Sequence, residues 1–142
     1  MTYGTHAVPC IYTLVYWTYR SPGHSVDPIR RDLTDVKVEG ILLAIERLRV
    51  LDREVPAQVI SCFLYIASHN HCHKEAIEED LGFTTASSSR NIDWLTDKHR
   101  LNKPGLGLVI KERDPDNKRR IICTLSSKGR DLIIDLMSDL YD

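Results

Sequence analysis

The stretch TTASSSRNIDWLTDKHR, residues 84–100, decides the fold that we expect for this chain. Five of its first six residues carry hydroxyl groups, which compete for backbone partners and make Ser and Thr mediocre inside helices. Apolar residues nevertheless follow at helical spacing, at Ile92 and Leu95. The stretch is therefore either a loop with a delayed helix start, or a helix whose first turn is kept small so that something can approach closely.

A helix that begins with Thr84 as its N-cap places Ser88, Ile92 and Leu95 on one inward face. Serines on that face would fill a tight helix crossing, and we favour this interpretation for Ser88. The residues assigned away from the inward face are Thr85, Ala86, Ser87, Arg90, Asn91 and Trp94. Trp94 is expected to pack against a neighbouring element rather than to stack on a base.

Small side chains at the start of this helix suit a recognition helix. A major groove about 12 Å wide admits a helix whose leading turn carries short side chains. The helix N-terminus and hydroxyl groups can hold phosphate oxygens. Arg90 and Asn91 are residue types that read guanine and adenine edges, respectively.

Bulk composition fits one globular domain and gives no global signal for nucleic acid. The chain has 142 residues, 42% of them hydrophobic and 27% charged, with a net charge of −1. The charge is unevenly spread, because seven Lys or Arg residues face three acids between Lys111 and Arg130. A locally basic face on a neutral protein still admits a polyanion.

The flanking patterns predict the remaining elements. Apolar residues at helical spacing predict a helix over residues 31–51, and Pro56 opens a second helix that is apolar on nearly every side. A short helix follows and ends at Gly82, where a left-handed residue is wanted. Two strands, residues 108–110 and 121–125, flank the turn residues DPDN, and Ser126 begins a final helix.

This order predicts a mainly α fold with a small β-hairpin wing, the winged helix-turn-helix arrangement. We expect an apolar N-terminal arm over residues 1–27 and a winged-helix domain over residues 28–142. Within that domain, residues 56–125 would form a DNA-binding core. The helices at 31–51 and 126–142 would form a dimer interface, because their apolar stripes leave much area to cover.

The basic residues of KERDPDNKRR, residues 111–120, gather near the tip of the predicted hairpin. They are Lys111, Arg113, Lys118, Arg119 and Arg120. Alone they would read as a solvated loop, and solvation also explains the carboxylates of Asp114 and Asp116. Beside a helix-turn-helix, such a tip is where a wing reaches a minor groove or flanking phosphates.

Residues 56–135 resemble the MarR-type winged-helix family of bacterial transcription regulators. LGFTTASSSRNIDWL resembles the turn and recognition helix of that family, and DPDNKRRIICTLSSKG resembles its wing. The resemblance implies a homodimer on a pseudo-palindromic operator, with the first and last helices as the dimer interface. It places the wing pair on Lys118 and Arg119 and puts Asn117 where the family has an acid. Residues 99–107 look like an insertion.

We therefore expect sequence-specific binding of double-stranded DNA by a homodimeric transcription regulator. Helix 84–98 would enter the major groove, and wing 108–125 would lie on the minor groove or backbone. The expected DNA-binding residues are Thr85, Ser87, Ser89, Arg90, Asn91, Arg113, Asn117, Lys118, Arg119 and Arg120. The expected protein is cytoplasmic and not an enzyme, needs no cofactor and no membrane, and leaves room for an unidentified small-molecule effector.

Two alternatives stay open. His69, His71, Cys72 and His73 are metal-ligand types, so a metal- or redox-responsive regulator is one alternative, although no metal is expected. Four widely spaced cysteines without a CxxC pair fit reduced thiols. The other alternative is a winged helix that binds only proteins, which would have no need for a basic wing beside a small helix face.

Overall fold

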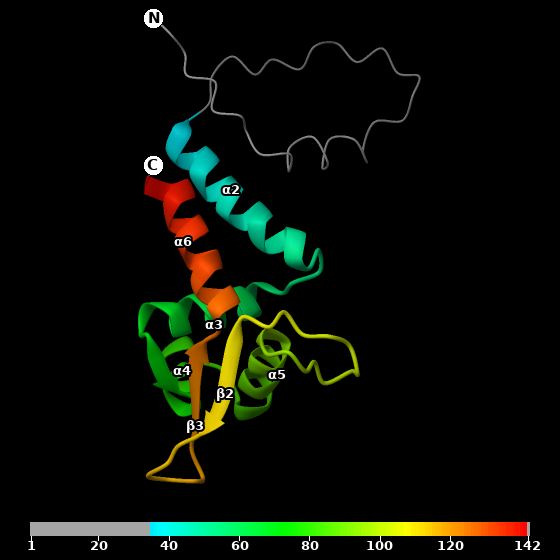
Figure 1. Ribbon diagram of the computed structural model, residues 1–142, viewed down its shortest axis with the longest axis vertical. Helices are drawn as coiled ribbons and strands as arrows, with labels where there is room; N and C mark the ends of the chain where they lie inside the picture. Colours follow the sequence, from blue (N-terminus) through cyan, green and yellow to red (C-terminus); the bar gives the residue numbers. More distant parts are fainter. Residues whose placement is uncertain (1–34, 142) are drawn as a thin grey trace, which may run out of the picture. The chain divides into compact units, whose positions relative to one another are not determined.

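The computed structural model describes residues 35–141, which form five helices and a three-stranded sheet (Figure 1). The predicted arm over residues 1–27 lies outside the described residues. In chain order the elements are α2 (Val36–Leu51), α3 (Ala57–Ser68), β1 (His71–His73), α4 (Lys74–Leu81), α5 (Thr85–Leu95), β2 (Val109–Arg113), β3 (Ile121–Leu125) and α6 (Ser127–Tyr141). The predicted fold class, a winged helix-turn-helix, is confirmed.

Helix α2 begins later than the predicted residue 31, and residues 31–34 are outside the described part of the chain. Asp35 is its N-cap, and the carboxylate accepts hydrogen bonds from the backbone N–H groups of Lys37 and Val38. Pro56 precedes α3 as predicted and stands at its N-cap. Both helix starts thus follow from local sequence signals.

The helix-turn-helix consists of α4, a short turn and α5. Helix α4 ends at Gly82, which has a φ of 67° in the left-handed region, as predicted for a glycine C-cap. Two residues later, the Thr84 hydroxyl accepts a hydrogen bond from the Ser87 N–H at 3.2 Å and starts α5. Helix α5 ends at Leu95 rather than at residue 98, because Thr96 turns to extended backbone.

The sheet has the strand order β1-β3-β2, with both pairs antiparallel. Strand β2 runs to Arg113, three residues beyond the predicted end, because its pairing with β3 continues to the contact of Arg113 with Ile121. Strand β1 was not predicted. In it, Cys72 is buried and stands opposite Cys123 of β3 in the strand register, and both cysteines are free thiols. A three-residue strand carries too little alternation to be recognised in the sequence.

The core lies where α3 meets α5 and the sheet. Its largest fully buried side chains include Phe63, Ile66, Ile77, Ile92 and Leu95. Helix α3 is the central element, and its buried residues contribute to one continuous cluster with those of the other helices and the sheet. This packing fixes the inward face of α5 and leaves its opposite face to solvent.

Helices α2 and α6 lie side by side (Figure 1). Gly40 allows the contact, because a Cβ there would lie 2.6 Å from the backbone carbonyl oxygen of Asp139. The Arg47 guanidinium binds both carboxylate oxygens of Asp139, and this pairing raises the pKa of Arg47. No helix among residues 35–141 is long and apolar enough to cross a membrane.

Candidate nucleic-acid interface

The exposed face of α5 begins with small side chains. Thr84, Thr85 and Ala86 are exposed, and Ser87 and Ser89 are half-buried. The Thr85 hydroxyl donates to Oε2 of Glu78 at 3.2 Å, which ties the first turn to α4. The helix therefore presents a narrow leading edge with hydroxyl groups on it.

Arg90 follows this edge one turn later and is exposed. Among residues 35–141 its side chain takes part in no hydrogen bond or salt bridge, so the guanidinium keeps its donors for an outside partner. A guanidinium has five N–H donors in a planar fork, which matches phosphate or a guanine edge.

Asn91 is not where the sequence analysis placed it. It was assigned to the outward face, but only 8% of it is exposed, and its Nδ2 donates to Oε1 of Gln58 on α3 at 3.3 Å. The inward stripe of α5 is wider than predicted, because Asn91 stands next to Ile92 and one turn before Leu95. Asn91 therefore links α5 to α3, and its side chain does not lie on the outward face where it could read adenine.

Two other residues of α5 lie as predicted. Ser88 is fully buried, and its small side chain fills the inward face of the helix. Trp94 packs against the core, and its Nε1 donates to Oδ2 of Asp52, the residue that follows α2, at 2.8 Å. Trp94 thus links α5 to the end of α2 and does not face outward as a stacking platform.

The wing loop, residues 114–120, joins β2 to β3 and is exposed apart from Asp114. Lys118, Arg119 and Arg120 lie in this loop, before β3 begins at Ile121, and Arg113 is the exposed last residue of β2. None of these four side chains makes a salt bridge within residues 35–141. The wing loop and the end of β2 thus carry four basic side chains that no carboxylate of the described residues pairs with, although Asp114 and Asp116 lie in the same loop.

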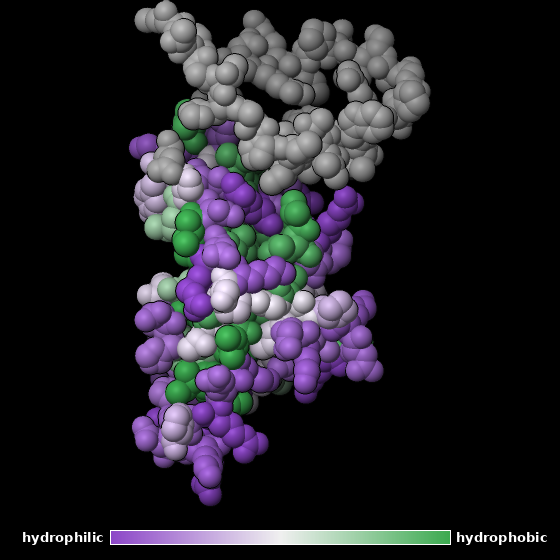
Figure 2. Space-filling model, viewed as in Figure 1, coloured by the Kyte–Doolittle hydropathy of each residue, from purple (hydrophilic) through white to green (hydrophobic). Residues whose placement is uncertain are grey.

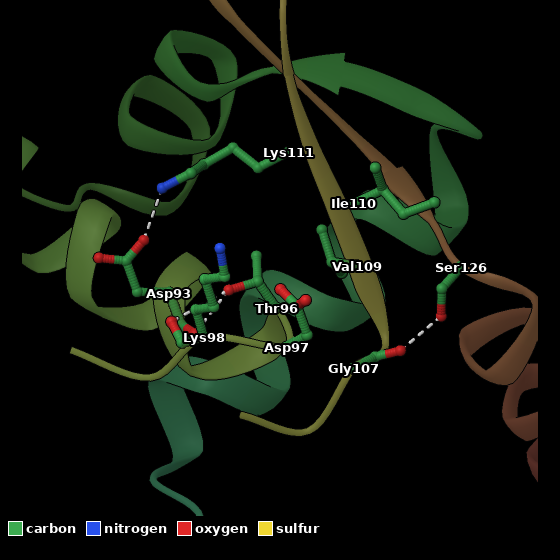
Figure 3. Close-up of a pocket in the computed structure, with 9 residues that line it drawn as sticks. All are labelled: Asp93, Thr96, Asp97, Lys98, Gly107, Val109, Ile110, Lys111 and Ser126. Atoms are coloured by element: carbon green, nitrogen blue, oxygen red, sulfur yellow. Dashed lines mark hydrogen bonds and ion pairs between the residues drawn. The ribbon is translucent and has the colours of Figure 1, made fainter. Parts of the chain in front are cut away.

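Lys111 does not belong to this cluster, although the sequence analysis counted it near the tip. It stands in the middle of β2, and its Nζ lies 2.6 Å from Oδ1 of Asp93 on α5. The pair crosses one end of a groove of about 610 Å³ between the end of α5 and β2 (Figure 3). Lys111 therefore neutralises a carboxylate and holds the wing strand against the helix.

The wing loop is organised by Asp114 and Asn117. The side-chain oxygen of Asn117 accepts a hydrogen bond from the backbone N–H of Arg119 at 3.2 Å. The backbone carbonyl of Asn117 accepts one from the backbone N–H of Arg120 at 2.8 Å. Oδ1 of Asp114 accepts from Asp116 N–H at 2.9 Å, and Oδ2 lies 2.8 Å from Nε2 of His73. These contacts, above all the hydrogen bond with His73, lower the pKa of Asp114.

The solvated role that the sequence analysis gave to Asp114 is therefore wrong, because this carboxylate is buried and bonded. The pattern DPDN contained a signal that was read only as a turn. An Asp at the start of such a turn accepts backbone N–H groups two residues on.

The His and Cys residues from His69 to His73 do not gather into a cluster. His69 follows α3 and stacks on Tyr65, with ring centroids 4.0 Å apart, whereas the alternation of β1 puts Cys72 on the face opposite to His71 and His73. Among residues 35–141 no group of three or more His, Cys, Asp or Glu side chains could hold a metal ion. Burial raises the pKa of the Cys72 thiol to about 11 and that of Cys123 to about 12.

Hydropathy varies between the two ends of the described domain (Figure 2). Hydrophilic side chains cover the end that carries the wing loop, and hydrophobic side chains reach the surface over α2 and α6. The exposed large hydrophobic residues of these two helices are Val36, Val38, Ile41, Leu42, Ile45 and Val50 on α2, and Ile134, Met137, Leu140 and Tyr141 on α6.

No protein-family model matches the sequence, and no curated protein matches it. Solved structures with the same fold do match. A MarR transcriptional regulator from Methanosarcina mazei Go1 is 16% identical, with a TM-score of 0.55 over 73% of this chain and 68% of its own. A mutant MarR from E. coli complexed with operator DNA is 18% identical, with a TM-score of 0.54 over 75% and 69%.

A third structure, the transcriptional regulator Tm0710 from Thermotoga maritima, is 17% identical, with a TM-score of 0.54 over 74% of this chain and 64% of its own. These proteins confirm the predicted resemblance at the level of the fold. The chain has the winged-helix architecture of MarR-type regulators, from α2 to α6, and the described elements α4, α5, β2 and β3 are its helix-turn-helix and wing.

Proposed function

We propose that this protein is a transcription regulator that binds double-stranded DNA sequence-specifically as a homodimer. The observation that carries the proposal is the pairing of two surfaces on one domain. Helix α5 leads with small side chains, and the neighbouring wing carries basic side chains that form no salt bridge within residues 35–141. The MarR structure complexed with operator DNA supports the proposal, because it has the same fold.

In this proposal, the start of α5 enters the major groove. The Ser87 and Ser89 hydroxyls contact phosphate oxygens or base edges, and Arg90 supplies the specific contact. The Thr85 hydroxyl, which donates to Glu78, is left to accept from a base edge. A bidentate contact of an arginine to guanine discriminates against other bases by about 1–3 kcal/mol. Because Asn91 is bonded to Gln58, the specific readout rests on Arg90.

The wing loop contributes affinity rather than specificity. Arg113, Lys118, Arg119 and Arg120 contact phosphates or the minor groove, with the Asn117 side chain shaping the loop between them. Each neutralised phosphate contributes about −0.9 to the slope of log affinity against log salt concentration. The wing should therefore act alike on every DNA sequence.

The dimer forms through α2 and α6. Val38, Ile41, Leu42 and Ile45 follow one another at helical spacing on α2, yet all four are substantially exposed in the single chain. Monomeric proteins rarely leave such a stripe uncovered, and a second copy of the chain is the commonest cover for it. Two joined recognition helices would also multiply the weak binding of each domain.

Selection of bound duplexes from a random pool, at one fixed salt concentration, tests the proposal. A palindromic consensus is expected, since two α5 helices related by a twofold axis read two half-sites. Pool sequences recovered without any consensus would contradict the sequence-specific function. Recovery of a consensus with a single half-site would contradict the dimer alone.

Two variants separate the two surfaces. Arg90→Ala is expected to relax base discrimination at one position of each half-site by about 1–3 kcal/mol. Arg119→Ala is expected to weaken binding to all sequences alike and to reduce the salt slope by about 1. Unchanged affinity and sequence preference in Arg90→Ala would show that α5 is not the recognition helix.

A further inference from the structure

A buried carboxylate, that of Asp114, stands at the start of the wing loop. Asp114 follows β2 directly and is 8% exposed, whereas residues 115–120 are all exposed. Its backbone N–H donates to the Arg120 carbonyl at 3.0 Å and closes the loop, while Oδ1 accepts from Asp116 N–H. Asp114 therefore closes the loop and holds its first turn, beside the contacts that Asn117 makes further along.

The second oxygen of Asp114 reaches out of the loop to His73. His73 ends β1 and stands at the N-cap of α4, and its backbone is held by pairing with Ile122 of β3. Since β3 lies between β1 and β2, the contact from Nε2 of His73 to Oδ2 of Asp114 spans the full width of the sheet at its wing end. It joins the first helix of the helix-turn-helix to the wing.

Within residues 35–141, this is the one side-chain hydrogen bond that leaves the wing loop. The other bonds of residues 114–120 stay inside the loop, at Asp116, Asn117, Arg119 and Arg120. A hairpin end held only by its own strands can swing, because its exposed backbone is tied to nothing else. The His73 contact removes that freedom on one side.

We infer that His73 and Asp114 are a positioning pair that sets the direction of the wing relative to α4 and α5. The inference rests on the proposed DNA-binding function and deepens it. Neither residue needs to touch DNA, because the pair acts through the cations of the loop that it holds, Lys118 and Arg119 foremost. A wing held in place in advance loses less conformational entropy when it binds phosphates.

His73→Phe tests the pair, and His73→Gln is its matched control. Phenylalanine keeps a planar ring but has no donor, whereas the glutamine amide offers an N–H group at a reach similar to Nε2. In the protein without DNA, hydrogen exchange at the Asp116 amide is expected to speed up by roughly tenfold in His73→Phe, as for loss of a hydrogen bond to a charged group. His73→Gln should restore most of the protection.

The second arm is a double-mutant cycle on duplex binding between His73→Phe and Arg119→Ala. If the pair positions the wing, the two losses are not additive, and Arg119→Ala costs much less in the His73→Phe background than in the wild type. Base discrimination by Arg90 should persist in His73→Phe. Additive losses together with unchanged amide exchange would overturn the inference.

The two arms also separate the inference from the function on which it rests. Wild-type protein that binds no duplex would refute the proposed function, and the exchange of the Asp116 amide would then decide the His73–Asp114 pair alone. Faster exchange that His73→Gln reverses would uphold the pair as the anchor of the wing, and unchanged exchange would overturn it.

Discussion

Ser88 is a buried residue whose polar group has no partner. It is fully buried in α5, and within residues 35–141 its hydroxyl makes no hydrogen bond. Its full burial on the inward face of α5 leaves room for a small side chain, but the fold makes no use of the oxygen. The hydroxyl is therefore a cost to folding and no part of the DNA-facing surface.

Ser88→Ala is accordingly expected to leave stability unchanged or to raise it by about 1 kcal/mol, since it removes a desolvated hydroxyl and keeps the volume. Urea unfolding measures the effect. Ser88→Val should destabilise the protein by about 1–3 kcal/mol through overpacking. A clear loss of stability in Ser88→Ala would mean that the hydroxyl has a partner in solution.

Asp114 makes stability depend on pH in a defined direction. The hydrogen bonds from His73 and from the Asp116 N–H favour the carboxylate and lower its pKa in the folded protein. Its stabilising contribution is therefore complete above the ordinary Asp pKa of about 4, and it is lost as the pH falls through the lowered value.

Asp114→Asn should be less stable than wild type at pH 7, and the difference should disappear as the pH falls below about 4. Urea unfolding at pH 7, 4 and 3 measures it. Asp116→Asn, at an exposed position of the same loop, is the control and should show no such trend. A stability gap for Asp114→Asn that is as large at pH 3 as at pH 7 would contradict the role of the ionised carboxylate.

At the scale of elements, the contact between α2 and α6 depends on one glycine. The missing side chain of Gly40 lets the backbone of Asp139 approach, and the bidentate pair of Arg47 and Asp139 lies seven residues further along α2. Of the apolar residues at helical spacing on α2, which are Val38, Ile41, Leu42, Ile45 and Leu48, only Leu48 is buried in the single chain.

Gly40→Ala is expected to push the two helices apart and to destabilise the protein by about 1–3 kcal/mol, even though alanine is the better helix former. Thermal or urea unfolding measures the change. Val36→Ala, at an exposed position of the same helix, should stay within about 0.5 kcal/mol of wild type. A stabilised Gly40→Ala variant would show that α2 and α6 do not hold this contact in solution.

At the scale of the whole molecule, the exposed stripe on α2 bears on assembly. Ile41 is 56% exposed in the single chain, so a charged side chain there should hardly change the stability of one copy. If the position is buried in a dimer, the same charge should strongly weaken association, because it would be desolvated without a partner. Ile41→Glu is therefore expected to yield monomers with nearly unchanged secondary structure. Sedimentation equilibrium measures the mass.

Leu101→Glu is the control for this experiment. Leu101 is 71% exposed and lies in the loop between α5 and β2, outside the helices that carry the proposed interface. This variant should retain the mass and the duplex binding of the wild type. An Ile41→Glu protein that is still dimeric would place the interface elsewhere on the molecule.

The local sequence by itself determined the helices, the hairpin of β2 and β3, and their order. Pro56, Gly82 and Thr84 act within a few residues, so the starts of α3 and α5 and the helix-turn-helix could be predicted from them, whereas the N-cap Asp35 was not recognised and α2 was expected from residue 31. The basic residues of the wing and the small side chains of the first turn of α5 could also be predicted, because they depend on residue type and spacing alone.

Only the tertiary structure decided what each side chain faces. Asn91 faces inward and donates to Gln58 of α3, and Lys111 pairs with Asp93 of α5. The three residues of β1 form a strand because they pair with the edge of β3. The His73–Asp114 contact joins positions 41 residues apart. Pairings between distant residues depend on how the elements pack, and no periodicity within a short window encodes them.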